Sequence, residues 1–146
     1  MKKTILFILF FLSIVATAQQ QSVAYSINPA TFEETTSITI TINGSAINEG
    51  SWGVTGNAIY MWTWSFDIND ANSIDCPTNG TWTSSNEANR FVYNSATDTY
   101  TKTFTPNVFY NRNGIGRIGF LVKAKDGTGD KKSQDNFVEV GAYQVT

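Results

Sequence analysis

The chain has 146 residues and a formal net charge of −2 at pH 7, with 14% aromatic and only 15% charged residues. It contains no histidine and one cysteine, Cys76, which excludes an intrachain disulfide, catalytic Ser/His/Asp and Cys/His groups, and histidine metal ligands. The low charge and the scattered basic residues argue against nucleic acid and an anionic membrane surface as partners. A composition rich in Thr, Asn and Ser instead suits neutral polar ligands such as sugars.

The first eighteen residues have the composition of a secretory signal peptide. Lys2 and Lys3 are followed by an almost continuous apolar run over residues 5–15 and then by the small residues of a cleavage site. This run is too short for a transmembrane helix. We therefore expect a secreted or cell-surface protein without membrane insertion, with a signal peptide over residues 1–18 and one module over residues 19–146. Removal of the two lysines takes the formal charge to −4.

Two strand patterns come first in the mature chain, each bounded by turn residues. Ser22–Ile27 predicts a first strand that Asn28-Pro29 ends. Ser37–Ile42 alternates isoleucine with serine or threonine, which predicts a half-buried antiparallel strand. The next stretch, residues 43–57, contains four glycines and predicts a long loop or a loop that carries a short edge strand.

Ile59–Phe66 is the most informative segment, because in a strand its alternating side chains form one wholly aromatic face. The aromatic face consists of Tyr60, Trp62, Trp64 and Phe66. The opposite face consists of Ile59, Met61, Thr63 and Ser65. An aromatic ladder of this kind is either part of a sandwich core or a stacking platform for a flat ligand. We expect Trp62 to be buried in the core, and Tyr60 and Trp64 to lie nearer the rim of the sheet.

The rest of the chain predicts further short strands, separated by polar turns and without helices. After a polar loop, these strands are Phe91–Tyr93, Tyr100–Phe104, Arg117–Lys123 and Phe137–Val140. In the third of them, alternation places Ile118, Phe120 and Val122 on one face. About seven short strands without helices predict an all-β fold, an antiparallel immunoglobulin-like β-sandwich.

Several aromatic and polar residues in the loops are candidates for ligand contacts. Trp82 has polar neighbours and Trp52 lies in a glycine-rich loop, so each either closes one end of the sandwich or contacts a ligand. Lys123, Asp126 and Gln134 offer hydrogen-bonding groups near a strand end, where an ordinary solvated turn is the alternative interpretation. A partly exposed tryptophan beside such groups can stack on the apolar face of a sugar ring.

The sequence argues against catalysis and against a bound metal or other cofactor. The oxygen-rich segments 67–75 and 126–130 lack the ligand spacing of a calcium-binding helix–loop–helix motif and a clear bidentate glutamate. A glycosidase needs two carboxylates that face each other across a cleft. The acidic residues of this chain lie mostly in turns, and a small sandwich offers little cleft in which two could converge. We therefore expect that the module itself is not an enzyme.

Several segments that together span nearly all of the mature chain carry a family likeness. They are Asn28–Phe32, Ser37–Ile42, Tyr60–Trp64, Tyr100–Phe104, Thr105-Pro106, Phe109-Tyr110, Ile118–Lys123 and the Asp126-Gly127 turn. In this order they resemble the immunoglobulin-like modules of secreted Bacteroidota proteins that degrade glycans. Similar modules precede α-amylase-type catalytic domains and occur in the outer-membrane starch-binding lipoproteins of that group. This chain differs from the lipoproteins because no cysteine follows its apolar run, and from the amylases because it carries no catalytic domain here.

The resemblance implies a secreted, non-catalytic module that binds polysaccharide, and it suggests starch-like α-glucan as the ligand. It implies an aromatic platform at Trp62 or Trp64, polar contacts from Lys123, Asp126 and Gln134, and a catalytic domain further along a longer chain as a partner. The alternative is a structural or adhesive immunoglobulin-like domain that binds protein or positions a neighbouring domain. Our candidate ligand-binding residues are Tyr60, Trp62, Trp64, Trp82, Lys123, Asp126 and Gln134.

Overall fold

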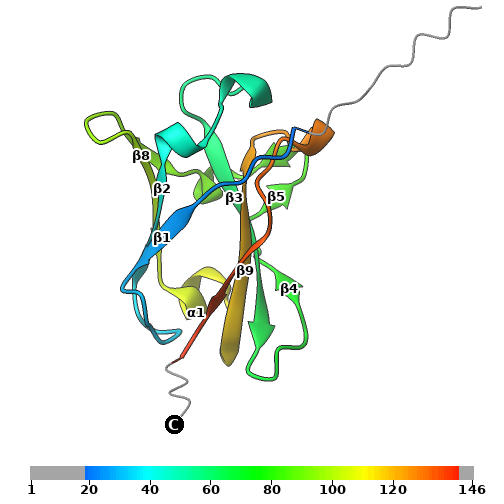
Figure 1. Ribbon diagram of the computed structural model, residues 1–146. Coiled ribbons are helices and arrows are strands. Elements are labelled where there is room, and N and C mark those ends of the chain that lie inside the picture. Colours follow the sequence, from blue (N-terminus) through cyan, green and yellow to red (C-terminus); the bar gives the residue numbers. More distant parts are fainter. Residues whose placement is uncertain (1–18, 142–146) are drawn as a thin grey trace, which may run out of the picture.

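Two antiparallel four-stranded sheets face each other in the computed structural model, which describes residues 19–141 (Figure 1). The first sheet has the order β1-β2-β8-β7, with β1 at Tyr25–Asn28, β2 at Ile38–Asn43, β8 at Thr99–Phe104 and β7 at Val92–Asn94. The second sheet has the order β10-β9-β3-β4, with β10 at Asn136–Glu139, β9 at Ile115–Ala124, β3 at Ile59–Asp67 and β4 at Ile74–Asp75. A separate hairpin pairs β5 at Gly80–Thr81 with β6 at Ser84–Ser85.

These sheets confirm the predicted all-β antiparallel sandwich. The strand order is compatible with the immunoglobulin-like topology, which stays a prediction. The predicted signal peptide, residues 1–18, and the last residues of the predicted module, 142–146, lie outside the described residues. Within residues 19–141, no helix is long and apolar enough to cross a membrane.

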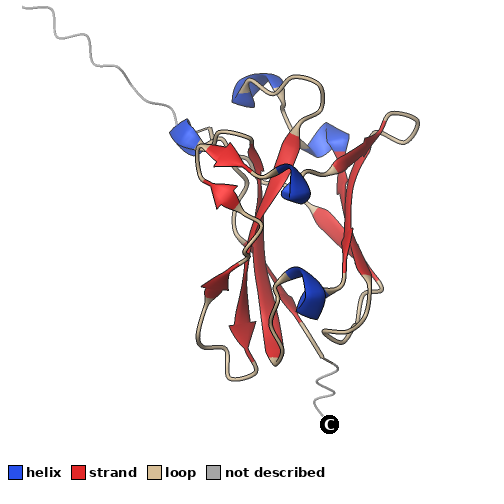
Figure 2. Cartoon of the chain, turned by 180° about the vertical axis from the view of Figure 1, so that it is seen from behind, coloured by secondary structure: helices blue, strands red, loops and turns tan. Residues whose placement is uncertain are grey.

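Short helical turns occupy the connections. They are η1 at Gly44–Ala46, η2 at Gly50–Trp52, η3 at Glu87–Asn89, α1 at Pro106–Phe109 and η4 at Thr128–Asp130. Figure 2 shows α1 at one end of the sandwich, apart from the other turns. The α1 turn corrects the expectation of a chain without helices. Pro106 stands at the start of the helix, where its fixed φ favours a helical turn.

The core lies between the two sheets and uses the alternating apolar residues of both. Its buried members include Ile38, Ile40 and Ile42 of β2 and Ile118, Phe120 and Val122 of β9. Trp52 belongs to the same cluster at 1% exposure, and its indole Nε1 donates to the carbonyl of Gln19 at 2.7 Å. Of the two roles left open for Trp52, the structure therefore selects closure of the core.

Strand β3 turns its aromatic residues away from the core. Ile59, Met61, Thr63 and Ser65 are buried between the sheets, and Trp62, Trp64 and Phe66 lie on the outer face with partial exposure. The expectation that Trp62 is a core residue is therefore wrong. The buried Thr63 Oγ1 donates to the carbonyl of Gly119 at 2.7 Å and is hydrogen-bonded to the Tyr110 hydroxyl. Because these partners satisfy the hydroxyl inside the core, the polar side of β3 can face inward.

Strand β4 pairs with only two residues of β3, Trp64 and Ser65. Along the rest of this edge, two buried asparagines form hydrogen bonds with the backbone of β3. Asn79 Oδ1 accepts from the Thr63 N–H at 3.1 Å, and Asn79 Nδ2 donates to the Thr63 carbonyl at 2.8 Å. Asn89 Nδ2 donates to the Met61 carbonyl and to Asn79 Oδ1, each at 3.0 Å. The segment 76–90 therefore replaces an edge strand with side-chain amides, which satisfy the free backbone groups of β3.

We expect Asn79→Ala to lower the free energy of unfolding by roughly 2–4 kcal/mol, because it leaves the Thr63 N–H buried without an acceptor. Urea denaturation followed by fluorescence measures this loss. Asn69→Ala is the matched control, because Asn69 is exposed and only its backbone N–H forms a hydrogen bond with the described residues. Equal stability of the two variants would contradict the role assigned to Asn79.

Candidate functional site

The outer face of the second sheet carries its side chains in rows that follow the strand register. Across β3 and β9, the rows pair Tyr60 with Lys123, Trp62 with Leu121, Trp64 with Gly119 and Phe66 with Arg117. Strand β10 extends the last two rows with Phe137 and Glu139. We use the name aromatic strip for the five partly exposed aromatic side chains on this face: Trp62, Trp64, Phe66, Trp82 and Phe137.

Trp64 occupies the middle of the aromatic strip and lies over the glycine opposite it. A Cβ atom at Gly119 would come within 2.2 Å of Trp64 Nε1 and Cε2, so the indole fills the space that any other residue would need. On the far side of Gly119, the ring of Phe137 stands at 78° to the indole, with 6.0 Å between ring centroids. A glycine inside a strand commonly marks such a close approach. The indole is thus held in place by β9 and by an edge-on aromatic neighbour.

Trp62 and Trp82 form the second part of the aromatic strip. Their rings meet edge to face, with centroids 5.3 Å apart and an angle of 75° between the planes. Trp82 comes from the turn between β5 and β6 and packs on Gly127, whose Cβ position would lie 2.5 Å from Trp82 Cε2. Leu121, which is buried but lies outside the core cluster, shares a row with Trp62. Trp82 is therefore part of this outer face and does not cover the end of the core.

Lys123 is fully buried next to the two tryptophans. Its Nζ donates to Ser85 Oγ at 2.6 Å and to the Lys125 carbonyl at 2.9 Å. The same atom lies 5.0 Å from the ring centroid of Trp82 and 5.9 Å from that of Trp62, within the range of a cation–π interaction. Burial lowers the pKa of Lys123 from 10.5 to about 8. Lys123 thus supports the tryptophan pair from inside, and its ammonium group does not reach the surface as a ligand contact would.

Three other candidate residues do not contribute an exposed group to the aromatic strip. Tyr60 is 1% exposed, which corrects the expected rim position, and its hydroxyl donates to Glu87 Oε1 at 2.7 Å. Asp126 is exposed, but its carboxylate accepts a hydrogen bond from the Thr128 N–H of its own turn, which lowers the pKa of Asp126. Gln134 is committed elsewhere: its side-chain amide exchanges two hydrogen bonds of 2.9 Å with the backbone of Val23.

Sequence reasoning missed two residues that complete this surface. Phe137 is 46% exposed on β10, and Arg117 contacts both Phe137 and Phe66. Arg117 Cζ is 4.4 Å from the Phe66 ring centroid and 4.8 Å from that of Phe137, and Arg117 Nη2 forms an ion pair of 2.7 Å with Asp70 Oδ1. The local signal for a crowded place on this face is Gly119, since a glycine inside a strand commonly marks a close approach by a neighbouring group.

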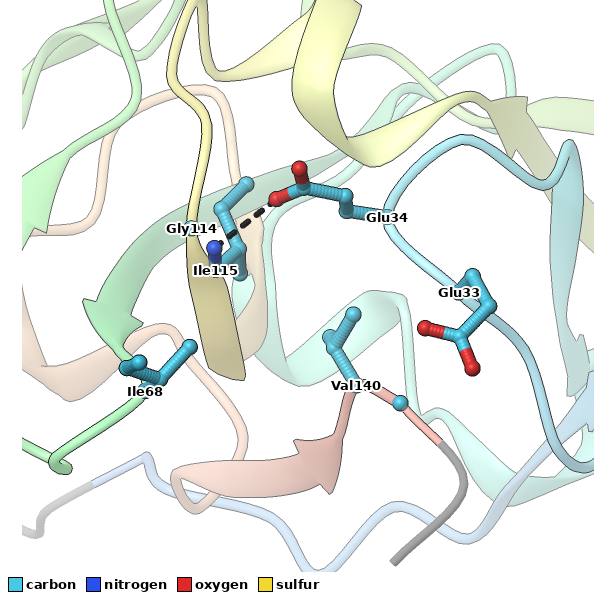
Figure 3. A pocket seen from close by; sticks show the side chains of 7 residues that line it. Glu33, Glu34, Ile68, Gly114, Ile115 and Val140 are labelled. Carbon is cyan, nitrogen blue, oxygen red and sulfur yellow. Dashed lines mark hydrogen bonds between the residues drawn. The ribbon is translucent and has the colours of Figure 1, made fainter.

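A pocket of about 380 Å³ lies at the end of the sandwich where β9 begins and β10 ends, apart from the aromatic strip (Figure 3). Its walls combine the aliphatic side chains of Ile68, Ile115 and Val140 with Glu33 and Glu34. The carboxylate of Glu34 accepts from the Ile115 N–H at 2.8 Å, so this group fixes the start of β9. None of the candidate ligand-binding residues lines this pocket.

Other reactive groups in the described part of the chain are engaged in the fold. Cys76 is buried, its Sγ lies 3.1 Å from Thr78 Oγ1, and burial raises the pKa of its thiol, which disfavours the nucleophilic thiolate. The carboxylate of Asp67 accepts from the Asn69 and Ala71 N–H groups of its own turn. Within residues 19–141, no group of three or more His, Cys, Asp or Glu side chains is placed to hold a metal ion.

The chain matches no protein-family model and no curated protein. The resemblance to glycan-binding modules therefore stays a prediction, and function has to be inferred from the geometry of the outer face. Of the candidate residues, the structure brings Trp62, Trp64, Trp82 and Lys123 together on that face. The arrangement can stack on a flat apolar surface, and Arg117 and Asp70 supply charged hydrogen-bonding groups at one end.

The buried Lys123 predicts a rise in stability with pH. Because its pKa is lower in the folded protein than in the unfolded chain, the unfolded chain binds more protons between about pH 8 and 10.5, and folding becomes more favourable across that window. From about pH 7.5 to about pH 9.5 we expect a gain of roughly 1–2 kcal/mol in the free energy of unfolding, measured with urea.

Lys123→Met is the control for this measurement, because it removes the titrating ammonium group and keeps an unbranched apolar stem. Tyr25, Tyr60 and Tyr93 have raised pKa values, and their ionisation in the unfolded chain lowers stability at high pH. They are present in both proteins, so the difference between wild type and variant isolates Lys123. The same pH dependence in both would refute the assignment.

Proposed function

We propose that this chain is a secreted, non-catalytic module that binds polysaccharide through the aromatic strip, and that its ligand is a starch-like α-glucan. The observation that carries this proposal is the outward direction of Trp62, Trp64 and Phe66. The solvent face of an antiparallel sheet ordinarily carries polar side chains. A row of partly exposed aromatic side chains in their place is typical of a surface that binds a ligand.

The chemistry of the strip suits a sugar ring. A pyranose has an apolar face of C–H groups, which is attracted to the negative face of an indole. Trp64 is already held by Gly119 and Phe137, so stacking on it costs little additional side-chain entropy. The strip lies on the face of a sheet, where two carboxylates have no cleft in which to converge on one glycosidic bond, which supports binding without catalysis.

A second candidate function is docking against a neighbouring protein domain. Ile68 and Ile74, at the β3–β4 connection, are 63% and 53% exposed. Aliphatic side chains offer no π face for a sugar, whereas they are common in protein interfaces. This observation favours the structural or adhesive alternative for that part of the surface. Affinity electrophoresis on glycans, described next, separates the two functions.

Affinity electrophoresis in gels that contain amylose, pullulan, β-glucan or glycol chitin tests the proposal. We expect the mature protein to be retarded by amylose and pullulan. Trp64→Ala removes the central ring of the strip, and we expect it to weaken binding at least tenfold, a loss on the order of 1.4 kcal/mol or more.

Val108→Ala is the matched control, because Val108 is an apolar residue of α1 with 75% exposure that lies outside the strip. Its mobility should equal that of the wild type in every gel. Unretarded migration of the wild type on all four glycans would refute the proposal in favour of the docking function. Wild-type binding by Trp64→Ala would refute the role of the strip.

A further inference from the structure

Arg117 has an unusual position at one end of the aromatic strip. Its guanidinium group contacts the rings of both Phe66 and Phe137, at 4.4 and 4.8 Å from their centroids. The centroids of the two rings are 6.3 Å apart. Since two aromatic rings contact the guanidinium group, its position is restrained and its N–H groups have defined directions.

Asp70 supplies the partner of Arg117 from the turn that follows β3. Asp70 Oδ1 is 2.7 Å from Arg117 Nη2, and the Asp70 side chain is 57% exposed. The turn is held by Asp67, whose carboxylate accepts hydrogen bonds from the N–H groups of Asn69 and Ala71 and from the side chain of Asn72. The carboxylate of Asp70 is therefore presented to solvent beside the strip by a rigid support.

A purely structural role accounts poorly for this pair. An ion pair with so exposed a partner contributes little to stability. Arg117 Nε is buried without a hydrogen-bond partner among the described residues, which is a cost of placing an arginine here. A neutral side chain could cover the two rings without that cost. Local arrangements that lower stability in this way are most often found at functional sites.

The pair offers charged donors and charged acceptors side by side. A sugar hydroxyl both donates and accepts hydrogen bonds, so two adjacent hydroxyls match a guanidinium next to a carboxylate. A second carboxylate lies beside Arg117, because the exposed Glu139 is opposite it in the strand register. The nearby cation Arg112 is engaged with the fold, since its Nη1 donates to Ser65 and to the Asn72 carbonyl. Two exposed carboxylates, Asp70 and Glu139, next to one guanidinium disfavour a ligand that carries its own negative charge.

We propose that Arg117 and Asp70 bind a pair of adjacent hydroxyls on a neutral polysaccharide stacked on the aromatic strip, and that the carboxylates of Asp70 and Glu139 beside Arg117 exclude acidic polysaccharides. This inference rests on the proposed function and adds the residues that select a neutral polysaccharide over an acidic one. It assigns Arg117 and Asp70 to specificity, a role that stacking on Trp64 alone cannot supply, because every pyranose has an apolar face.

Asp70→Asn is the sharpest test. Asp70 has a φ of 58°, a left-handed conformation that asparagine tolerates well, so the variant keeps the turn and removes one negative charge. Binding is measured by isothermal titration with soluble amylose and with amylose oxidised to carboxylates at C6. We expect the wild type to bind amylose at least tenfold more tightly than the oxidised polymer. We expect Asp70→Asn to bind amylose roughly tenfold more weakly, the loss of one charge-assisted hydrogen bond, and to discriminate less against the oxidised polymer.

Asp130→Asn is the matched control, because Asp130 is also exposed and left-handed, with a φ of 55°, and belongs to η4. It should bind both polymers as the wild type does. Arg117→Lys keeps the positive charge and loses the planar guanidinium, so we expect it to bind amylose as weakly as Asp70→Asn.

The outcomes separate this inference from the proposed function. If the wild type binds no glycan, or if Trp64→Ala binds normally, the proposed function fails and the inference fails with it. If Trp64→Ala loses binding while Asp70→Asn and Arg117→Lys keep wild-type affinity and selectivity, only the inference is overturned. A merely structural role would shift the unfolding midpoint of the variants without changing the ratio of the two affinities.

Discussion

The direction in which β3 turns its alternating side chains determines the rest of this structure. A shift of one residue would bring the aromatic face into the core and carry Thr63 and Ser65 to the surface. The observed register is held by polar contacts, because Thr63 finds the Gly119 carbonyl and the Tyr110 hydroxyl inside the sandwich. A buried hydroxyl without these partners would be costly, so the inward side of β3 depends on residues that come much later in the chain.

The segment that completes the edge of β3 also builds part of the functional surface. Asn79 and Asn89 bind the free backbone groups of β3, and between them the chain carries Trp82 and Ser85. Trp82 then meets Trp62, and Ser85 accepts a hydrogen bond from Lys123. The stability of the sheet edge and the placement of the aromatic strip therefore depend on the same segment, residues 76–90. A substitution that weakens the sheet edge should also displace Trp82 from the strip.

Much of the fold could be predicted from the sequence, because local alternation is enough to place short strands and to say which side chains share a face. The alternation in Ile59–Phe66 correctly grouped the aromatic residues, but it could not decide which group faces the core. Hydrophobicity alone favoured burial of Trp62, and the contrary outcome depends on Tyr110 and Asn79, whose contacts with Thr63 no local pattern encodes.

The candidate site was predictable to a similar degree and for similar reasons. Trp62 and Trp64 could be identified from the aromatic face of Ile59–Phe66, and Trp82 from its polar neighbours. Gln134 was a reasonable candidate that the structure engages with Val23, a contact across the whole length of the chain. Phe137 and Arg117 were missed because their places beside Trp64 and Phe66 depend on the register between β3, β9 and β10, which is a property of the assembled sheet.

The burial of Lys123 makes motion of this surface measurable. Reagents that acylate amines react with the unprotonated form, and the lowered pKa of Lys123 gives it a larger unprotonated fraction than a surface lysine at the same pH. Yet its nitrogen is enclosed by Ser85, the Lys125 carbonyl and two indoles, so a reagent reaches it only when this shell opens. The rate of acylation at this one amine therefore reports how often the shell opens, and a molecule stacked on the two indoles would lower that rate.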